Sequence, residues 1–184
     1  MRPHVERLRA RGIEAMAIDL PRGRAEHAVA AYLAASGSGP DVVIGGHSYG
    51  GRVASLLAAS GERFGGLVLF SYPLHRPGGP EWESRTAHWP AIACPALLLS
   101  GESDPFARVD LLRLAVSSRL PGAELVLYPK LGHGLLPMLA AALDRTAAFV
   151  CALAAGTPPE QAGPGREPAA RARAERAGTG EERP

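Results

Sequence analysis

The chain has 184 residues, 46% of them hydrophobic, and its formal net charge at neutral pH is +2. A chain of this length can enclose a core of its own, since about 150 residues bury close to 70% of the surface of the unfolded chain. Its basic residues are scattered among acids without a basic stripe, which argues against nucleic acid as a partner. The sequence shows no apolar secretion signal and no apolar run of the about 18 residues that span a membrane. We therefore expect a cytoplasmic protein that does not bind membranes.

Apolar runs of strand length alternate with amphipathic segments along most of the chain. Strands are predicted where β-branched or leucine-rich runs are bounded by Gly and Pro, and helices where apolar residues recur at helical spacing. In chain order, the expected elements are a helix at 3–12, a strand at 13–20, a helix at 24–36, strand 42–44, helix 53–59, strand 66–71, a connection at 72–93, strand 95–100, helix 106–120, strand 124–128 and helix 135–154.

Apolar strands that alternate with helices are typical of a parallel sheet that helices cover on both faces. We therefore predict an α/β, three-layer fold with a mostly parallel sheet of about five strands, in one domain over residues 1–154. Residues 155–184 are rich in Gly, Pro, Ala, Arg and Glu and nearly free of large apolar side chains. That composition predicts a disordered tail, because it offers too little apolar surface to bury.

One stretch organises this pattern: the strand 42–44 leads into Gly46-His47-Ser48-Tyr49-Gly50, and a helix follows. A strand, a sharp turn and a helix in this order expose the hydroxyl of a serine at the turn. The free N–H groups at the start of the helix would stabilise negative charge that develops beside Ser48. The alternative is a glycine-rich loop that binds phosphate, although the sequence has no G-x-x-x-x-G-K-[ST] motif.

Two further polar residues follow later strands of the expected sheet. Asp104 comes after strand 95–100, and His133 comes after strand 124–128. Because ligand sites of parallel sheets lie beyond the carboxyl ends of the strands, we expect Ser48, Asp104 and His133 at one edge. His133 would accept the proton of the serine hydroxyl and return it to the leaving group. Asp104 would hold the imidazole in the correct tautomer and stabilise its charged form.

Each of these residues has an alternative interpretation. Asp104 would also suit the N-cap of a helix that begins near Pro105, and Glu102 and Asp110 remain as reserve acids. His133 would also suit a loop histidine with only local hydrogen bonds. His47 is more typical of a turn residue than of a base, because neighbouring side chains on such a turn do not easily reach each other.

Several motifs together resemble a known family, over about residues 3–153. They are Gly46-His47-Ser48-Tyr49-Gly50-Gly51-Arg52, Tyr72-Pro73-Leu74-His75-Arg76-Pro77-Gly78, Arg85-Thr86-Ala87-His88-Trp89-Pro90, Cys94-Pro95-Ala96-Leu97, Gly101-Glu102-Ser103-Asp104-Pro105-Phe106 and Gly132-His133-Gly134. With these motifs the chain resembles the dienelactone-hydrolase-like α/β-hydrolases, in the branch grouped with the testis-expressed and histone-acetyltransferase-complex hydrolase-like proteins. The resemblance implies Ser48, Asp104 and His133 as the catalytic triad and the N–H of Tyr49 as one oxyanion donor. Enzymes named dienelactone hydrolase use a cysteine in place of Ser48, so their substrate is not carried over.

The start of the chain departs from this family. The family's fold opens with three strands and a loop that supplies the second oxyanion donor, whereas Met1 already stands at the helix that follows them. We therefore expect an N-terminally truncated version of the fold. The third strand of the family lies between the strands that match 13–20 and 42–44, so its absence predicts either a gap or direct pairing. An unpaired edge at 42–44 would favour self-association.

Residues 72–93 stand where these hydrolases often carry a lid. The residues that we expect near a substrate pocket are His47, Pro73, His75, Arg85 and His88, and the alternative for the whole segment is an ordered proline-rich loop. The sequence predicts no metal site and no cofactor, because His, Cys and acids do not occur at ligand spacing. Two functions remain: a serine hydrolase of a small-molecule ester, thioester or related acyl bond, or a catalytically impaired hydrolase-fold protein that serves as a binding module.

Overall fold

The computed structural model describes residues 2–79 and 81–156. The predicted tail at 155–184 therefore falls, from residue 157 onward, outside the described residues. The elements are α1 (Arg2–Arg9), α2 (Ala25–Ser36), β1 (Gly39–His47), α3 (Tyr49–Ala58), β2 (Phe64–Phe70), α4 (Glu83–Thr86), the 3-10 turn η1 (Trp89–Ala91), β3 (Ala96–Gly101), α5 (Val109–Arg119), β4 (Glu124–Tyr128), the 3-10 turn η2 (Leu136–Met138) and α6 (Leu139–Ala154).

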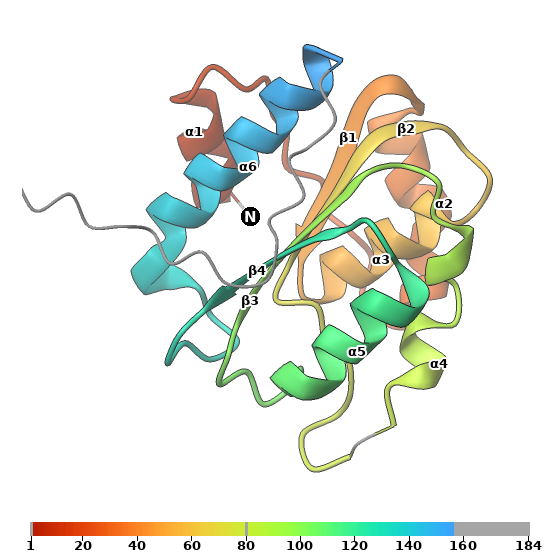
Figure 1. Cartoon of the computed structure of the whole chain (residues 1–184). Coiled ribbons are helices and arrows are strands. Elements are labelled where there is room, and N and C mark those ends of the chain that lie inside the picture. The colour runs from red at the N-terminus through yellow and green to blue at the C-terminus, as the bar shows by residue number, and fades with distance from the viewer. Residues whose placement is uncertain (1, 80, 157–184) are drawn as a thin grey trace, which may run out of the picture.

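The four strands form one parallel sheet in the order β1-β2-β3-β4. Helices cover both of its faces: α1 and α6 lie on one side, and α2, α3, α4 and α5 lie on the other (Figure 1). This arrangement confirms the predicted α/β fold with a parallel sheet between two helical layers. All connections between the strands carry helices or a long crossover, as parallel pairing requires.

The core consists of two apolar layers that the sheet separates. Side chains alternate between the two faces of a strand, so Leu67 and Leu69 of β2 pack toward α2, α3 and α5, while Val68 and Phe70 pack toward α6. Leu67 and Leu69 are fully buried, and burial of such a side chain contributes roughly 1.5–3 kcal/mol to stability. The continuous apolar run of β2 thus follows from its position inside the sheet.

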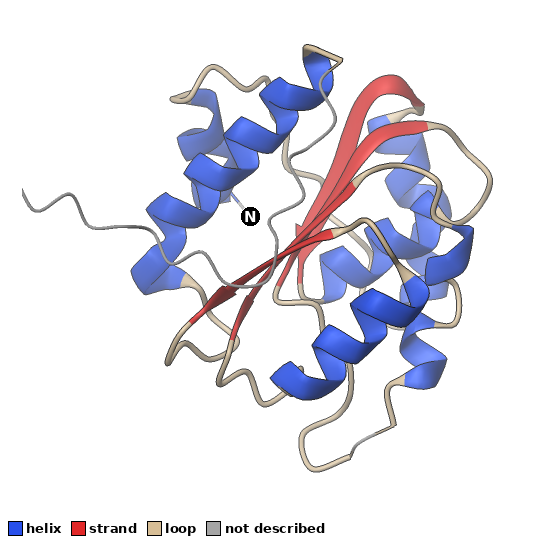
Figure 2. Cartoon of the chain, viewed as in Figure 1, coloured by secondary structure: helices blue, strands red, loops and turns tan. Residues whose placement is uncertain are grey.

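The sheet has four strands where about five were predicted, because residues 13–20 do not form a strand. Figure 2 shows this segment as loop between α1 and α2. A cavity of about 470 Å³ separates it from β1, with Ile13 and Met16 on one side and Val43 and Gly45 on the other. Of the two alternatives that the sequence left open, the structure has the gap. A strand needs ladder hydrogen bonds from a neighbour, and an apolar pattern alone does not supply them.

A tyrosine side chain occupies part of the place where a ladder partner of β1 would lie. The hydroxyl of Tyr32 donates to the carbonyl of Gly45 at 2.7 Å and accepts from the N–H of Gly45 at 3.0 Å. One side chain on α2 therefore forms hydrogen bonds with both the backbone N–H and the carbonyl of Gly45 in β1. Buried backbone groups without partners would otherwise cost stability.

One apolar segment differs from the expectation that the sequence holds no stretch of membrane-spanning length. Leu136–Ala154 has 19 residues with a hydropathy of 1.5, which suffices by length and composition for a helix that crosses a membrane. In the structure this segment forms η2 and α6, and Leu143 and Phe149 of α6 are fully buried against the sheet. Its apolar composition is thus used, on its inner side, to cover one face of β2 and β3.

Candidate active site

Ser48 is the single residue between the end of β1 and the start of α3. Its backbone has φ 50° and ψ −112°, a conformation that L-residues rarely adopt. Two backbone hydrogen bonds hold it there: its N–H donates to the carbonyl of Phe70 at 2.9 Å, and its carbonyl accepts from the N–H of Arg52 at 3.0 Å. The neighbouring strand and the first turn of α3 therefore force the serine into the strained turn that the sequence predicts.

Two glycines make this turn sterically possible. A Cβ on Gly46 would lie 2.4 Å from the backbone of Gly50, and a Cβ on Gly51 would lie 2.9 Å from the carbonyl oxygen of Gly46. Gly50 itself has open space where its Cβ would lie. The sequence motif thus predicted the turn, and the residues that must be small for steric reasons are Gly46 and Gly51, whereas Gly50 has space for a side chain.

Asp104 stands in the turn that follows β3, and its side chain is fully buried. One carboxylate oxygen accepts from the N–H of Phe106 at 2.8 Å, and both oxygens lie near Nδ1 of His133, at 3.1 and 2.9 Å. Helix α5 begins only at Val109, with Arg108 at its N-cap. Asp104 therefore orients an imidazole and a turn and does not cap the helix, which corrects the alternative that the sequence left open.

His133 lies in the loop after β4, with Nε2 at 2.8 Å from Oγ of Ser48. The loop is held close to the end of β3, since Ser103 donates its N–H to the carbonyl of Leu131 at 2.8 Å. An ionised carboxylate can only accept hydrogen bonds, so Nδ1 of His133 carries the proton toward Asp104. That tautomer leaves Nε2 free to accept the hydroxyl proton of Ser48.

Two aromatic rings fix the orientation of this imidazole. The ring of Phe106 lies 4.6 Å from the ring of His133, and the ring of His47 lies 5.2 Å from it on a tilted edge. Nε2 of His47 also lies 3.2 Å from the backbone carbonyl of His133. Burial lowers the pKa of His47, so its ring is neutral near pH 7 and donates this bond without adding a charge beside His133.

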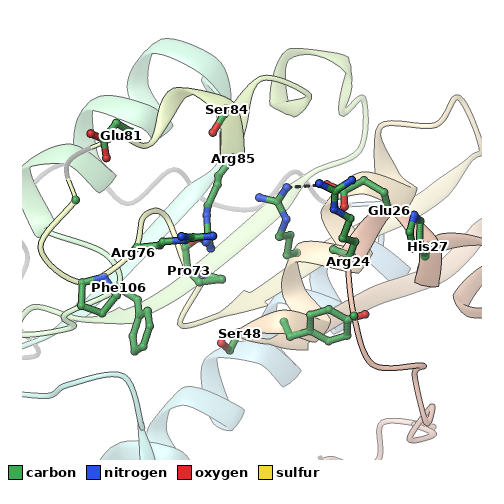
Figure 3. Close-up of a pocket in the computed structure, with 16 residues that line it drawn as sticks. Arg24, Glu26, His27, Ser48, Pro73, Arg76, Glu81, Ser84, Arg85 and Phe106 are labelled. Atoms are coloured by element: carbon green, nitrogen blue, oxygen red, sulfur yellow. Dashed lines mark hydrogen bonds and ion pairs between the residues drawn. The ribbon is translucent and has the colours of Figure 1, made fainter.

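An open cavity of about 1190 Å³ begins at Ser48 and extends between α2, α3 and the connection 72–93. Figure 3 shows Ser48 at its base, with Pro73, Arg76 and Arg85 on one side and Arg24 and Glu26 on the other. The cavity has room for a small acyl substrate next to the serine hydroxyl.

Of the five residues expected near a substrate pocket, Pro73 and Arg85 line this cavity, whereas His47, His75 and His88 do not. His75 is 2% exposed, and its ring bonds the carbonyl of Arg76 at 2.8 Å and accepts from the N–H of Arg108 at 3.0 Å. His75 thus joins the connection 72–93 to the start of α5. The prediction failed here because neighbouring residues in a loop point in different directions, which sequence position does not reveal.

His88 bonds Oγ of Ser55 on α3 at 2.8 Å through its Nε2. Burial is the main cause that lowers the pKa of His88 to about 4, and the nearby charge of Arg52 lowers it further. A neutral imidazole in this place anchors the segment before η1 to α3. Both ends of the connection 72–93 are therefore packed into the core, with Tyr72 and Trp89 almost completely buried and in contact.

Sequence reasoning missed several residues that line this cavity, and Arg52 and Phe106 are the two nearest in sequence to Ser48 and Asp104. Arg52 follows Ser48 by one helical turn on α3, and Phe106 follows Asp104 by two residues in the same turn. The spacing of four residues was a usable signal for Arg52, since residues one turn apart share a helix face. Within residues 2–79 and 81–156, no group of three or more His, Cys, Asp or Glu side chains is placed to hold a metal ion.

A family profile described as "Alpha/beta hydrolase domain" matches residues 21–148, which include Ser48, Asp104 and His133. The chain belongs to the alpha/beta hydrolase family. No curated protein matches the sequence of this chain.

Solved structures share the fold of this chain at low sequence identity. It aligns with a monoacylglycerol lipase from Paleococcus ferrophilus at a TM-score of 0.69 and 14% identity, over 82% of this chain and 88% of that one. A predicted CIB-like hydrolase from Thermoplasma acidophilum gives a TM-score of 0.57 and 22% identity over 70% of this chain. The chain spans 60% of the length of the Thermoplasma protein. SOBER1 from Arabidopsis thaliana aligns at a TM-score of 0.53 and 20% identity, over 77% of this chain and 72% of that one.

Proposed function

We propose that this chain is a serine hydrolase that cleaves an ester, thioester or related acyl bond through an acyl-enzyme on Ser48. The observation that carries the proposal is the continuous hydrogen-bonded series from Oγ of Ser48 through His133 to Asp104. A nucleophile, a base and an orienting carboxylate in this order are the components that acyl transfer needs. The resemblance of the sequence to dienelactone-hydrolase-like proteins supports the same chemistry and narrows the proposed branch of the family.

The reaction proceeds in two halves. In the first, Oγ of Ser48 forms a bond to the carbonyl carbon while its proton moves to Nε2 of His133, and collapse of the tetrahedral intermediate expels the alcohol or thiol with that proton. In the second half, water attacks the acyl-enzyme, gives a proton to His133 and releases the acid as Ser48 regains its hydrogen. Asp104 stays ionised and stabilises the imidazolium in both halves.

Negative charge on the carbonyl oxygen is stabilised by backbone N–H groups at the start of α3. The N–H of Tyr49, the first residue of that helix, is the oxyanion donor in this proposal. The aligned peptide dipoles of α3 also place the positive end of the helix dipole beside the carbonyl oxygen. This donor depends only on the turn at Ser48 and not on the edge of the sheet beyond β1.

A second function, a hydrolase-fold binding module with impaired catalysis, is favoured by the gap beside β1. The loop that supplies a second oxyanion donor in the resembling family follows the strand that would fill this place. The cavity of about 470 Å³ lies there instead. Loss of one such donor typically lowers the rate about 100- to 1000-fold.

Hydrolysis of 4-nitrophenyl acetate separates the two functions. A hydrolase should show a burst of nitrophenolate equal to the enzyme concentration, followed by steady turnover, and a mass increase of one acetyl group on the purified protein. Ser48→Ala should abolish both the burst and the added mass. A rate indistinguishable between the wild-type chain and Ser48→Ala would contradict the hydrolase and favour the binding module.

A further inference from the structure

The cavity beside Ser48 carries an unusual excess of positive charge. Four arginines and two glutamates line it: Arg24, Arg52, Arg76, Arg85, Glu26 and Glu81. Glu26 is already engaged, because one of its oxygens accepts from Nη2 of Arg52 at 2.8 Å. A neutral acyl chain would gain nothing from such a lining, since guanidinium groups prefer carboxylate and phosphate oxygens.

Arg76 and Arg85 approach each other without a carboxylate between them. Figure 3 shows both side chains above Pro73 and Ser48, and the charge of Arg76 acts on Arg85. Ion pairs within the described part of the chain involve five other arginines, and neither Arg76 nor Arg85 takes part in one. Two adjacent like charges repel unless an anion is placed beside them.

Arg85 is the more constrained of this pair. It is half-buried on α4, and its Nη1 donates to the carbonyl of Pro73 at 3.0 Å. Burial is the main cause that lowers the pKa of Arg85, and the charges of Arg52 and Arg76 lower it further, against a smaller opposite effect of Tyr72. The folded protein therefore holds a guanidinium where its positive charge is incompletely compensated.

Arg52 adds a further positive charge that is built into the wall of the cavity. Its Nη1 is inaccessible to solvent and has no hydrogen-bond partner among the described residues, although Nη2 is paired with Glu26. Arg52 also lies one helical turn after Ser48, so its position is fixed relative to the nucleophile. Because an atom that water cannot reach is also closed to a ligand, Nη1 is not a donor to a bound anion, and Arg52 acts on the cavity through its positive charge.

We propose that the substrate of Ser48 carries an anionic group, a carboxylate or a phosphate, which Arg85 and Arg76 bind in the cavity beside the nucleophile, with the positive charge of Arg52 nearby. This inference rests on the proposed serine hydrolase, and it adds the chemical class of the acyl compound. The anion neutralises the adjacent arginines and fixes the scissile carbonyl at Ser48. Neutral esters of the same length enter the cavity without that anchor and bind more weakly.

The main test compares matched esters that differ only in charge. We measure kcat/KM for 4-nitrophenyl hydrogen adipate, for its methyl ester, and for the 4-nitrophenyl ester of 4-phosphonobutanoic acid. An anionic anchor predicts that kcat/KM for the anionic esters exceeds that for the neutral ester by about 10-fold or more, mainly through a lower KM. This preference should decrease as added salt screens the charges. The stronger of the two acids identifies which anion the cavity fits.

Two variants separate the role of Arg85 from general effects of arginine removal. Arg85→Gln should lower the ratio of anionic to neutral kcat/KM to near 1, and Arg85→Lys should restore part of it. The control is Arg108→Gln, which removes an exposed arginine that pairs with Asp110 outside the cavity and should leave the ratio unchanged. Equal ratios for wild type and Arg85→Gln would overturn the assignment of Arg85.

A binding experiment keeps this inference separate from the proposed catalysis. Calorimetry with Ser48→Ala should detect adipate or inorganic phosphate, and the heat should disappear in Ser48→Ala combined with Arg85→Gln. Binding without any ester hydrolysis would support the anion site and contradict the hydrolase. Hydrolysis at equal rates for anionic and neutral esters, with neither anion bound, would support the hydrolase and overturn the anion site.

Discussion

The carboxyl edge of the sheet and the free edge of β1 differ in how their polar groups are satisfied. At the carboxyl edge, Ser48, His133 and Asp104 bond one another, and Asp104 also accepts a backbone N–H. At the free edge, the backbone of β1 faces a cavity, and the hydroxyl of Tyr32 serves Gly45. The hydrogen-bonded series of Ser48, His133 and Asp104 is thus built from turns after β1, β3 and β4 and uses no residue beyond the free edge of β1. Substitutions at the first edge should affect catalysis, and those at the second should affect stability.

The largest effect is expected at Asp104. Asp104→Asn would present an amide to Nδ1 of His133 and favour the wrong tautomer, so we expect kcat/KM for 4-nitrophenyl acetate to fall about 10⁴-fold. The matched control is Asp110→Asn, a reserve acid that pairs with Arg108 on the surface, which should leave the rate unchanged. A loss at Asp110 equal to that at Asp104 would contradict the assignment of the orienting acid.

At the free edge we expect a change in stability instead. Tyr32→Phe leaves both backbone groups of Gly45 without their present partner, which should lower the free energy of unfolding by about 1–3 kcal/mol in urea. Tyr49→Phe is the control, because its hydroxyl donates to the carbonyl of Pro21 at the exposed surface and should cost much less. If the two variants unfold at the same urea concentration, the hydroxyl of Tyr32 does not support this edge.

A smaller, pH-dependent effect is expected at His88, in the connection 72–93 between β2 and β3. Its folded pKa is about 4 and its ordinary value is 6.5, so the unfolded chain binds the proton more readily. Its contribution is complete above pH 6.5 and is lost as the pH falls toward 4, by on the order of 1 kcal/mol after allowance for its partial exposure. Comparison of urea unfolding for the wild type and His88→Gln should show curves that converge over this range. Parallel curves would exclude the burial of a neutral imidazole.

The smallest effect is expected from the unpaired groups of β1. The backbone N–H and carbonyl of Gly45 point away from β2, toward Tyr32. Backbone groups two residues apart in a strand point the same way, so those of Val43 also point away from β2. An unpaired strand edge favours pairing with another chain, and we expect a second copy to associate weakly at high protein concentration. Val43→Pro removes the donor and should weaken this association in sedimentation velocity. A wild-type chain that stays monomeric at all concentrations would contradict association through this edge.

The contrast between the edges also explains what the sequence could predict. The turn at Ser48, the acid after β3 and the histidine after β4 each follow from a local pattern of apolar strand, small residues and polar loop. Residues 13–20 carry a strand pattern as well, but a strand also requires a partner, which sequence pattern does not supply. The four parallel strands could therefore be predicted from the sequence, whereas the absence of a strand at residues 13–20 could not.

Side-chain direction was the second limit. His75 and Arg85 lie in the same connection, yet one is buried against the backbone of Arg108, 33 residues away, and the other faces the cavity. Only the packing of Tyr72, Trp89 and α4 on the core decides between these directions. Arg52 is the opposite case, because helical spacing from Ser48 would have been enough to find it.

The most direct test of the account is covalent labelling of Ser48. A fluorophosphonate probe should form one adduct per chain, and peptide mapping should place that adduct on Ser48, because only a serine activated by His133 attacks the phosphorus at neutral pH. His133→Ala should slow the labelling strongly while the protein remains folded. Labelling that continues unchanged in Ser48→Ala, or that maps to another residue of the wild-type chain, would contradict the central claim.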